Sequence, residues 1–219
     1  MLDGEQMIEV GHAKLTPGMT EPVTIVKTEK RVDAEQPLPV LLHPGKTTVE
    51  VRLTAGNAPL PYTLSWSYRT LKPASADAPP VHLTTHLSTP KSQEGKSVKL
   101  KAAIENRSGH DQGMAVAIIG LPAGLALPAD FAQLKELARL REDGAKPGVI
   151  SAWEVKGREL VLYWRDLKSD AKIEFELDLV SRLPGVYSGP AGRAYLYYNA
   201  DHKHWVEPLR VTIEPAAGS

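Results

Sequence analysis

The feature of this sequence that most constrains the fold is the strict alternation of apolar and acidic residues in KIEFELDL, residues 172–179. The apolar positions are Ile173, Phe175, Leu177 and Leu179, and the positions between them are Glu174, Glu176 and Asp178. Successive side chains of a β-strand point to opposite faces of the sheet, so this pattern predicts a strand with one dry and one wet face. The pattern recurs in KTTVEVRL, YTLSWSYR, KSVKLKAAIEN, GRELVLYW and PLRVTIE. Short strands separated by glycine, proline and asparagine turns are typical of antiparallel β-sandwiches.

One segment, PADFAQLKELARLRED, departs from the two-residue period. Its apolar residues fall at helical spacing with charged residues between them; they are Phe131, Leu134, Leu137, Ala138 and Leu140. Pro128 and Asp130 are suited to open a helix here, and Gly144 is suited to close it. The sequence therefore predicts one helix near residues 129–143, inserted in a connection between two strands.

The segment LKPASADAPP, residues 71–80, is typical of an interdomain linker, because it is rich in proline and small residues and has no periodicity. We therefore expect a β-sandwich segment over residues 1–72, a linker over 73–80 and a second domain over 81–216. The opening part of the first segment, up to about Gln36, is poorly patterned. The predicted fold class is mainly β, with two antiparallel β-sandwich units, the second of which carries the helix.

Composition excludes several classes of function. The 219 residues have a formal net charge of zero and an isoelectric point near 7.1, which argues against a general affinity for nucleic acid. There is no cysteine, so thiolate catalysis and cysteine zinc sites are excluded. No basic region followed by an apolar run begins the sequence, so no signal peptide is expected. The longest apolar stretch, Met114–Ile119, is too short to span a bilayer, and no membrane insertion is expected.

The order of elements in the second domain is more specific than its composition. A strand holding Gly113–Met114 ends in a Gly-Leu-Pro turn and is followed by a helix containing Leu-Lys-Glu-Leu. Next come a strand with Glu154–Val155, a Leu-Val-Leu-Tyr strand, the acidic-hydrophobic strand and, near the C-terminus, Ala-Tyr-Leu-Tyr-Tyr. This order resembles the C-terminal receptor-binding domain of the alpha-2-macroglobulin family, and the likeness covers roughly residues 81–213. Before it, HPGKTTVEVRL and YTLSWSYRTLKP look like the strands that complete a CUB-type sandwich in the same family.

The resemblance carries implications for location and partners. It implies that this chain is the C-terminal portion of a much larger protease-trapping protein and carries only the later strands of the CUB-type domain. That would account for the poorly patterned opening. It also implies an extracellular or periplasmic location as part of that protein. The implied partners are other domains of the same protein or its cleaved form, with target proteases involved indirectly.

The start of the chain resembles the reactive thioester motif of this family, Cys-Gly-Glu-Gln. Gly4, Glu5 and Gln6 match its last three positions, but Asp3 occupies the cysteine position, so no thioester can form. The helical domain that normally separates this motif from the following strands is also missing. We interpret the match as coincidental.

The segment RAYLYYNADHKHWVEP, residues 193–208, is the densest in reactive side chains. His202 and His204 would lie about 7 Å apart on one face of a strand, and with Glu207 or Asp201 could in principle bind a metal. The alternative is that both histidines lie in an exposed hairpin turn at Asn-Ala-Asp. Because no third ligand is placed by the sequence, we predict no metal and no cofactor here.

Two groups of residues are expected to face other domains. Tyr195, Tyr197 and Tyr198 give one strand bulky groups on both faces, and only one face can enter the core of the domain. In VHLTTHLS, His82 and His86 share a strand face with Thr84, opposite the apolar residues Val81, Leu83 and Leu87. Both groups are predicted to form an interdomain surface.

The helix offers a second candidate surface. In animal members of the family, lysines on and near this helix contact a clearance receptor. Lys135 is the nearest counterpart, with Arg139 and Arg141 following on the polar side. The alternative is an ordinary amphipathic helix with a solvated face.

No sequence motif indicates catalysis: there is no Gly-x-Ser-x-Gly elbow, glycine-rich phosphate loop or paired-carboxylate arrangement. Asn106–Arg107–Ser108 is a formal glycosylation sequon, meaningful only in a eukaryotic secretory setting. The leading hypothesis is a non-catalytic module of an alpha-2-macroglobulin-like protease trap. The alternatives are a free-standing β-sandwich module for adhesion or ligand binding and a metal-dependent hydrolase using His202, His204 and Glu207.

Overall fold

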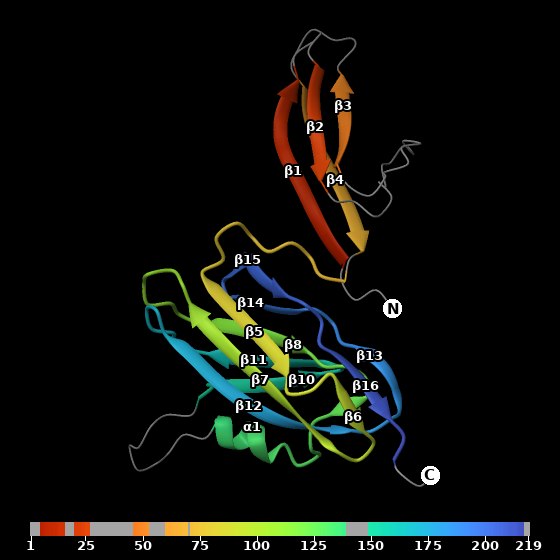
Figure 1. The fold of residues 1–219 in the computed structure, drawn as a ribbon. Coiled ribbons are helices and arrows are strands. Elements are labelled where there is room, and N and C mark those ends of the chain that lie inside the picture. Colours follow the sequence, from red (N-terminus) through yellow and green to blue (C-terminus); the bar gives the residue numbers. More distant parts are fainter. Residues whose placement is uncertain are drawn as a thin grey trace. The chain divides into compact units, whose positions relative to one another are not determined.

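The computed structural model describes residues 5–15, 20–26, 46–52, 60–69, 71–138 and 149–216, the first four ranges as backbone. The chain divides into two units, Met1–Thr70 and Leu71–Ser219 (Figure 1). Strands dominate both units, and the described residues contain one α-helix. The prediction of a mainly β protein with antiparallel sheets is therefore confirmed.

The first unit contains two antiparallel strand pairs. β1 (Glu5–Leu15) pairs with β4 (Leu60–Arg69), and β2 (Thr20–Val26) pairs with β3 (Lys46–Arg52). The segments KTTVEVRL and YTLSWSYR thus form strands, as predicted. The thioester-like residues Glu5 and Gln6 begin β1, opposite Arg69 and Tyr68 of β4.

Two of these strands lie in the opening part of the chain, which is poorly patterned in the sequence. A β-bulge explains why β1 escapes recognition, because its register shifts at Gly11, between Val10 and His12. The β-branched apolar residues before the shift, Ile8 and Val10, are at even positions, and the apolar residues after it, Ala13 and Leu15, are at odd positions. No single two-residue period runs through the whole strand.

The second unit is a β-sandwich (Figure 1). One sheet has the order β10 (Ala152–Lys156), β11 (Glu159–Trp164), β8 (Ala115–Gly120), β14 (Gly192–Leu196), β15 (Asn199–Val206). The other has the order β5 (Val81–Leu87), β7 (Ser97–Asn106), β12 (Lys172–Ser181), β9 (Leu125–Ala126). A small third sheet contains β13 (Gly185–Ser188), β16 (Arg210–Glu214) and β6 (Lys91–Gln93), with β6 parallel to β16.

The core lies between the two large sheets and contains the apolar side of each alternating strand. Leu83, Leu100, Ile104, Leu177 and Leu179 have no more than 1% of their surface exposed. Each contributes about 2 kcal/mol to folding through burial. All residues of β8 are buried, because this strand lies at the centre of its sheet with side chains covering both faces. The apolar stretch Met114–Ile119 is therefore a core strand.

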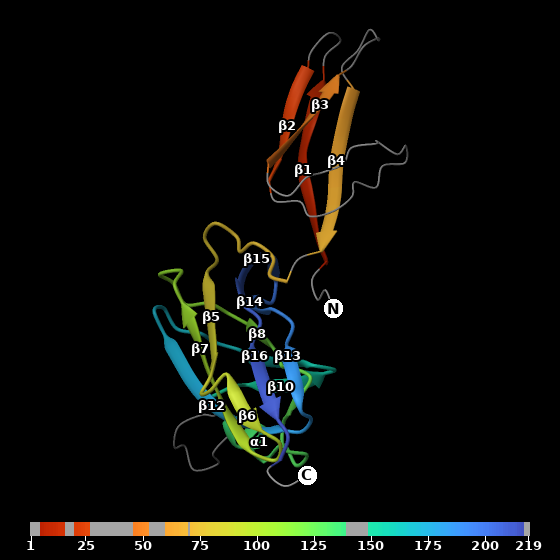
Figure 2. The same ribbon diagram turned by 45° about the vertical axis from the view of Figure 1, so that its right-hand side comes forward.

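The helix α1 (Ala132–Leu137) begins later than predicted, and residues 139–148 lie outside the described part of the chain. Phe131 adopts a left-handed conformation before it, and Asp130 Oδ1 accepts a hydrogen bond from the Ala132 amide at 3.1 Å. Leu134 is fully buried. The Gln133 side chain accepts from the Asp178 amide at 2.7 Å and donates to its carbonyl at 3.2 Å. The helix thereby covers the edge of β12, beside which it lies (Figures 1 and 2).

The predicted linker, residues 71–80, belongs structurally to the second unit. The Ala76 amide donates to the Lys203 carbonyl of β15 at 2.9 Å. The Ser75 hydroxyl accepts from the Trp205 amide at 2.8 Å, and Lys72 pairs with Glu207 at 2.8 Å. Pro73 and Pro79 are buried. These residues therefore cover the edge of β15 and satisfy part of its backbone hydrogen bonding.

Candidate functional site

The chain between β14 and β15 turns at Tyr197 and Tyr198, which are both exposed. Tyr198 has 86% of its surface exposed and Tyr197 has 49%. Their rings meet edge to face with centroids 5.1 Å apart, and the Tyr197 ring lies 6.5 Å from that of Tyr163 on β11. This arrangement keeps a large aromatic surface in contact with solvent.

Tyr195 lies on the face of β14 that is turned away from the main core. There, Val116, Ile118 and Val161 form a separate buried cluster, and Tyr163 and Tyr195 pack over it. The aromatic residues on this outer face, together with those of the turn, are Tyr163, Tyr195, Tyr197, Tyr198 and Trp205; we call them the aromatic face.

Two cations lie over rings of the aromatic face. The Arg193 guanidinium is 5.3 Å from the centre of the Trp205 ring, and the Lys203 ammonium is 5.4 Å from that of Tyr195. Arg193 is also held by Glu159 through two contacts, at 2.6 and 3.3 Å. The Arg193 guanidinium is thus fixed in place over the aromatic face.

A carboxylate lies at the border of the aromatic face. The Tyr163 hydroxyl donates to Glu154 at 2.8 Å, and burial followed by this carboxylate raises the pKa of Tyr163. Lys156 and then the Tyr163 hydroxyl lower the pKa of Glu154. Tyr163 therefore serves as a hydrogen-bond donor to Glu154.

The two histidines of the H-x-H pair do not lie in a turn, so the predicted hairpin at Asn-Ala-Asp was wrong. Both belong to β15, with His202 exposed and His204 half-buried. His204 Nδ1 accepts a hydrogen bond from the Leu83 amide of β5 at 3.2 Å. Its ring stacks on that of His82, with centroids 4.3 Å apart. The structure therefore brings together two histidines that the sequence analysis assigned to different features.

Burial and neighbouring charge keep this histidine pair neutral. Desolvation, followed by His82, Arg107 and Lys72, lowers the pKa of His204 to about 4. Desolvation and then Arg107 lower the pKa of His82, while Glu105 opposes that effect. Because Nδ1 of His204 accepts a hydrogen bond, its neutral ring carries the proton on Nε2.

Within residues 71–138 and 149–216, no group of three His, Asp or Glu side chains is placed to hold a metal ion. Glu207 is paired with Lys72, and Asp201 and His202 are exposed on β15. His86 is exposed on β5 and is separate from the stacked histidines. The three residues of the hydrolase hypothesis are therefore held in different environments.

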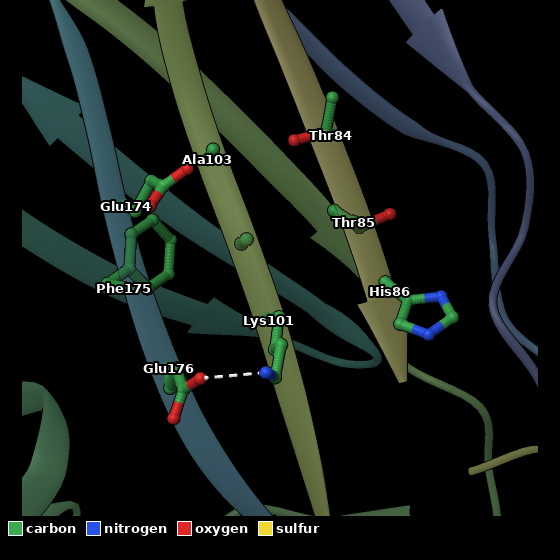
Figure 3. Close-up of a pocket in the computed structure, with 9 residues that line it drawn as sticks. Thr84, Thr85, His86, Lys101, Ala103, Glu174, Phe175 and Glu176 are labelled. Atoms are coloured by element: carbon green, nitrogen blue, oxygen red, sulfur yellow. Dashed lines mark ion pairs between the residues drawn. The ribbon is translucent and has the colours of Figure 1, made fainter. Parts of the chain in front are cut away.

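The outer face of the other large sheet has a shallow hollow of about 410 Å³ (Figure 3). Its floor is Ala103, which lies between Thr84 and Glu174 across three strands. The Lys101 ammonium pairs with Glu176 at 3.3 Å along one side, and the His86 ring points away from that pair (Figure 3). Two partly exposed ion pairs border the hollow, from Lys99 and Lys101 to Glu176.

Lys135 is exposed in the last turn of α1. Arg139 and Arg141, the other residues of the predicted recognition surface, lie outside the described residues. The Arg193–Glu159 pair and the contact of Lys203 with the Tyr195 ring were not predicted from the sequence. Alternation along β14 places Arg193 on the same face as Tyr195, which is a signal that the sequence does contain. The place of Lys203, on β15, depends on the register of the two strands.

No family model matches this sequence, and the curated proteins contain no match to it. Solved structures are similar to it. They include native Escherichia coli alpha-2-macroglobulin from domain MG7 to the C-terminus, with 14% identity and a TM-score of 0.55, covering 79% of this chain and 31% of that one. Salmonella alpha-2-macroglobulin reacted with methylamine matches with 15% identity and a TM-score of 0.55, covering 93% of this chain and 14% of that one.

A further similar structure is the native conformation of E. coli alpha-2-macroglobulin, with 14% identity, a TM-score of 0.56 and coverage of 79% of this chain and 12% of that one. The chain thus spans less than a third of the length of each of these three alpha-2-macroglobulin structures. None of the described helices is long and apolar enough to cross a membrane. The chain has the fold of the C-terminal part of bacterial alpha-2-macroglobulin, as its sequence resemblance predicted.

Proposed function

We propose that this chain is the non-catalytic C-terminal portion of an alpha-2-macroglobulin-like protease trap, located in the periplasm or outside the cell. The observation that carries the proposal is the shared fold over 79–93% of the chain. In such a protein the domain would bind a neighbouring domain of the same polypeptide. Cleavage of the trap by a protease would then change that contact.

The aromatic face is the surface best suited to this contact. A buried tyrosine removes about 150–250 Å² from water, so covering Tyr197 and Tyr198 contributes several kcal/mol before the cost of association. Both side chains are already held against other rings, which lowers the entropy lost on binding. Lys203 adds positive charge to the aromatic face, whereas the charge of Arg193 is balanced by Glu159. An apolar patch bordered by a carboxylate would therefore be a complementary partner surface.

The proposal is tested by measuring binding of this chain to the remaining polypeptide of the full-length protein, once intact and once cleaved by a protease. We expect the two forms to bind with different affinities. Changing Tyr197 and Tyr198 together to serine should weaken the tighter complex by about 100-fold, as expected for two anchor side chains. Val186→Ser is the matched control, because Val186 is 82% exposed but lies on β13.

Equal and negligible binding to both forms would remove the proposed mechanism. A native reading frame that encodes only this chain would favour the free-standing binding module instead. Purified chain containing stoichiometric zinc, lost when His202 and His204 are replaced, would contradict the non-catalytic assignment.

A further inference from the structure

The structure joins three segments at one side of the second unit: residues 71–80, β5 and β15. Ser75 and Ala76 bind the backbone of β15, and His204 of β15 accepts the Leu83 amide of β5. The His82 ring of β5 lies against that of His204, with centroids 4.3 Å apart. We call this group the latch. It consists of the Ser75 hydroxyl, the Ala76 amide and the rings of His82 and His204.

The latch depends on an unprotonated ring nitrogen. β5 is an edge strand, and its Leu83 amide points out of the sheet toward His204 Nδ1. A protonated Nδ1 is a donor and cannot accept this hydrogen bond. The Leu83 amide would then lose its partner in a region that is only partly accessible to water.

Protonation would also place a positive charge among other cations. The ring of His204 is influenced by Lys72 from the preceding segment, Arg107 after β7 and His82 on β5. The nearby carboxylates are already engaged, since Glu105 pairs with Arg107 at 2.6 Å and Glu207 pairs with Lys72. On β14, the residue opposite His204 is Ala194, which carries no charge.

We propose that the latch is proton-sensitive: protonation of His204 as the pH falls toward 4 separates β15 from β5 and loosens residues 71–80. The pKa of His204 is lowered to about 4 when the latch is closed, and it would return toward its ordinary value when the latch opens. Protons therefore bind the open form more tightly, so acid favours opening.

The proposal is tested on the whole chain by NMR amide exchange, with protection factors for Leu83 and Ala76 compared at pH 6.5 and pH 4. We expect both protection factors to be about tenfold lower at pH 4 than at pH 6.5. This size allows for solvent screening of a half-buried ring. His204→Gln retains a side-chain acceptor that does not titrate in this range and should abolish the fall. His202→Gln, on the same strand but exposed, should behave like the wild type.

Core amides at Leu100 and Leu177 distinguish latch opening from unfolding. An equal fall at those amides would contradict the proposal, as would unchanged protection at Leu83. The chemical shift of the Leu83 amide provides a test that needs no variant. It should titrate with the His204 ring, and independent titrations would contradict the proposal.

Discussion

Asn106 lies at the end of β7 and is expected to be a major determinant of stability in the second unit. It is 1% exposed, and its side-chain nitrogen donates to the carbonyls of His110, Leu167 and Lys168 at 2.7, 3.0 and 2.9 Å. Its oxygen accepts from the amide and hydroxyl of Ser108 at 3.0 and 2.7 Å. One side chain therefore joins the loop after β7 to the loop before β12.

The stability lost in Asn106→Ala depends on which hydrogen bonds the partners of Asn106 keep. The Leu167 carbonyl still accepts from the Gln112 amide, and the Lys168 carbonyl still accepts from the Ala171 amide. No acceptor is left completely unpaired, so we expect the loss of several hydrogen bonds worth about 0.5–1.5 kcal/mol each, or roughly 2–3 kcal/mol in total. Asn106→Asp should cost more at neutral pH, because it turns a carboxylate toward three carbonyls in a buried site.

Urea unfolding in a Trp66→Phe background measures this effect, since the remaining tryptophans all lie in the second unit. Ser108→Ala serves as the milder control, with an expected loss of about 1 kcal/mol. A loss below about 1 kcal/mol for Asn106→Ala, or an Asp variant as stable as the wild type, would refute the reasoning. The same burial predicts that the Asn106 sequon of the folded chain is not glycosylated, because its nitrogen is fully engaged.

Three further predictions concern a close approach, a sheet edge and pH. Gly120→Ala should destabilise the second unit by several kcal/mol, because a Cβ would lie 2.0 Å from the Pro190 carbonyl oxygen; Gly113→Ala, with no atom within 4 Å, is the control. Thermal unfolding of both variants would show a clear difference, and equal stability would contradict it. Gln133→Ala should cost about 1–2 kcal/mol in urea unfolding, since both backbone groups of Asp178 lose their partner; Lys135→Ala, exposed on the same helix, should have almost no effect. The pKa of His204 is lowered to about 4 in the folded state, from an ordinary value of 6.5. The neutral ring therefore contributes to the free energy of unfolding above the unfolded pKa, and this contribution is lost as the pH falls toward 4. Between these values the free energy of unfolding should fall by about 1–2 kcal/mol more in the wild type than in His204→Gln, and equal pH dependence of the two would contradict the assignment.

The alternating strands were predictable because one of their faces is buried. KIEFELDL and KSVKLKAAIEN form β12 and β7, and their expected inward residues, such as Leu100 and Leu177, lie in the core. The position of the helix was also predictable from its apolar spacing. Its start was not, because the left-handed Phe131 delays it beyond Pro128 and Asp130.

The residues of the candidate site were less predictable, for two physical reasons. β15 reads NADHKHWV, which has no alternation, and Asn-Ala-Asp resembles a turn more than Tyr197–Tyr198 does. The contact of His204 with Leu83 joins residues that are 121 positions apart, so no local pattern encodes it. The exposure of Tyr198 follows from its place in the turn between β14 and β15, so it too could be seen only in the structure.

The central claim is that the aromatic face contacts another domain in the intact trap and that cleavage changes this contact. The most direct measurement is the rate at which a Tyr198→Cys thiol reacts with a maleimide in the full-length protein, before and after protease cleavage, compared with the rate in this chain alone. The exposure of Tyr198 predicts fast labelling of the isolated chain. The account predicts strong protection in the intact protein and a different rate after cleavage. Labelling as fast as in the isolated chain, both before and after cleavage, would contradict it.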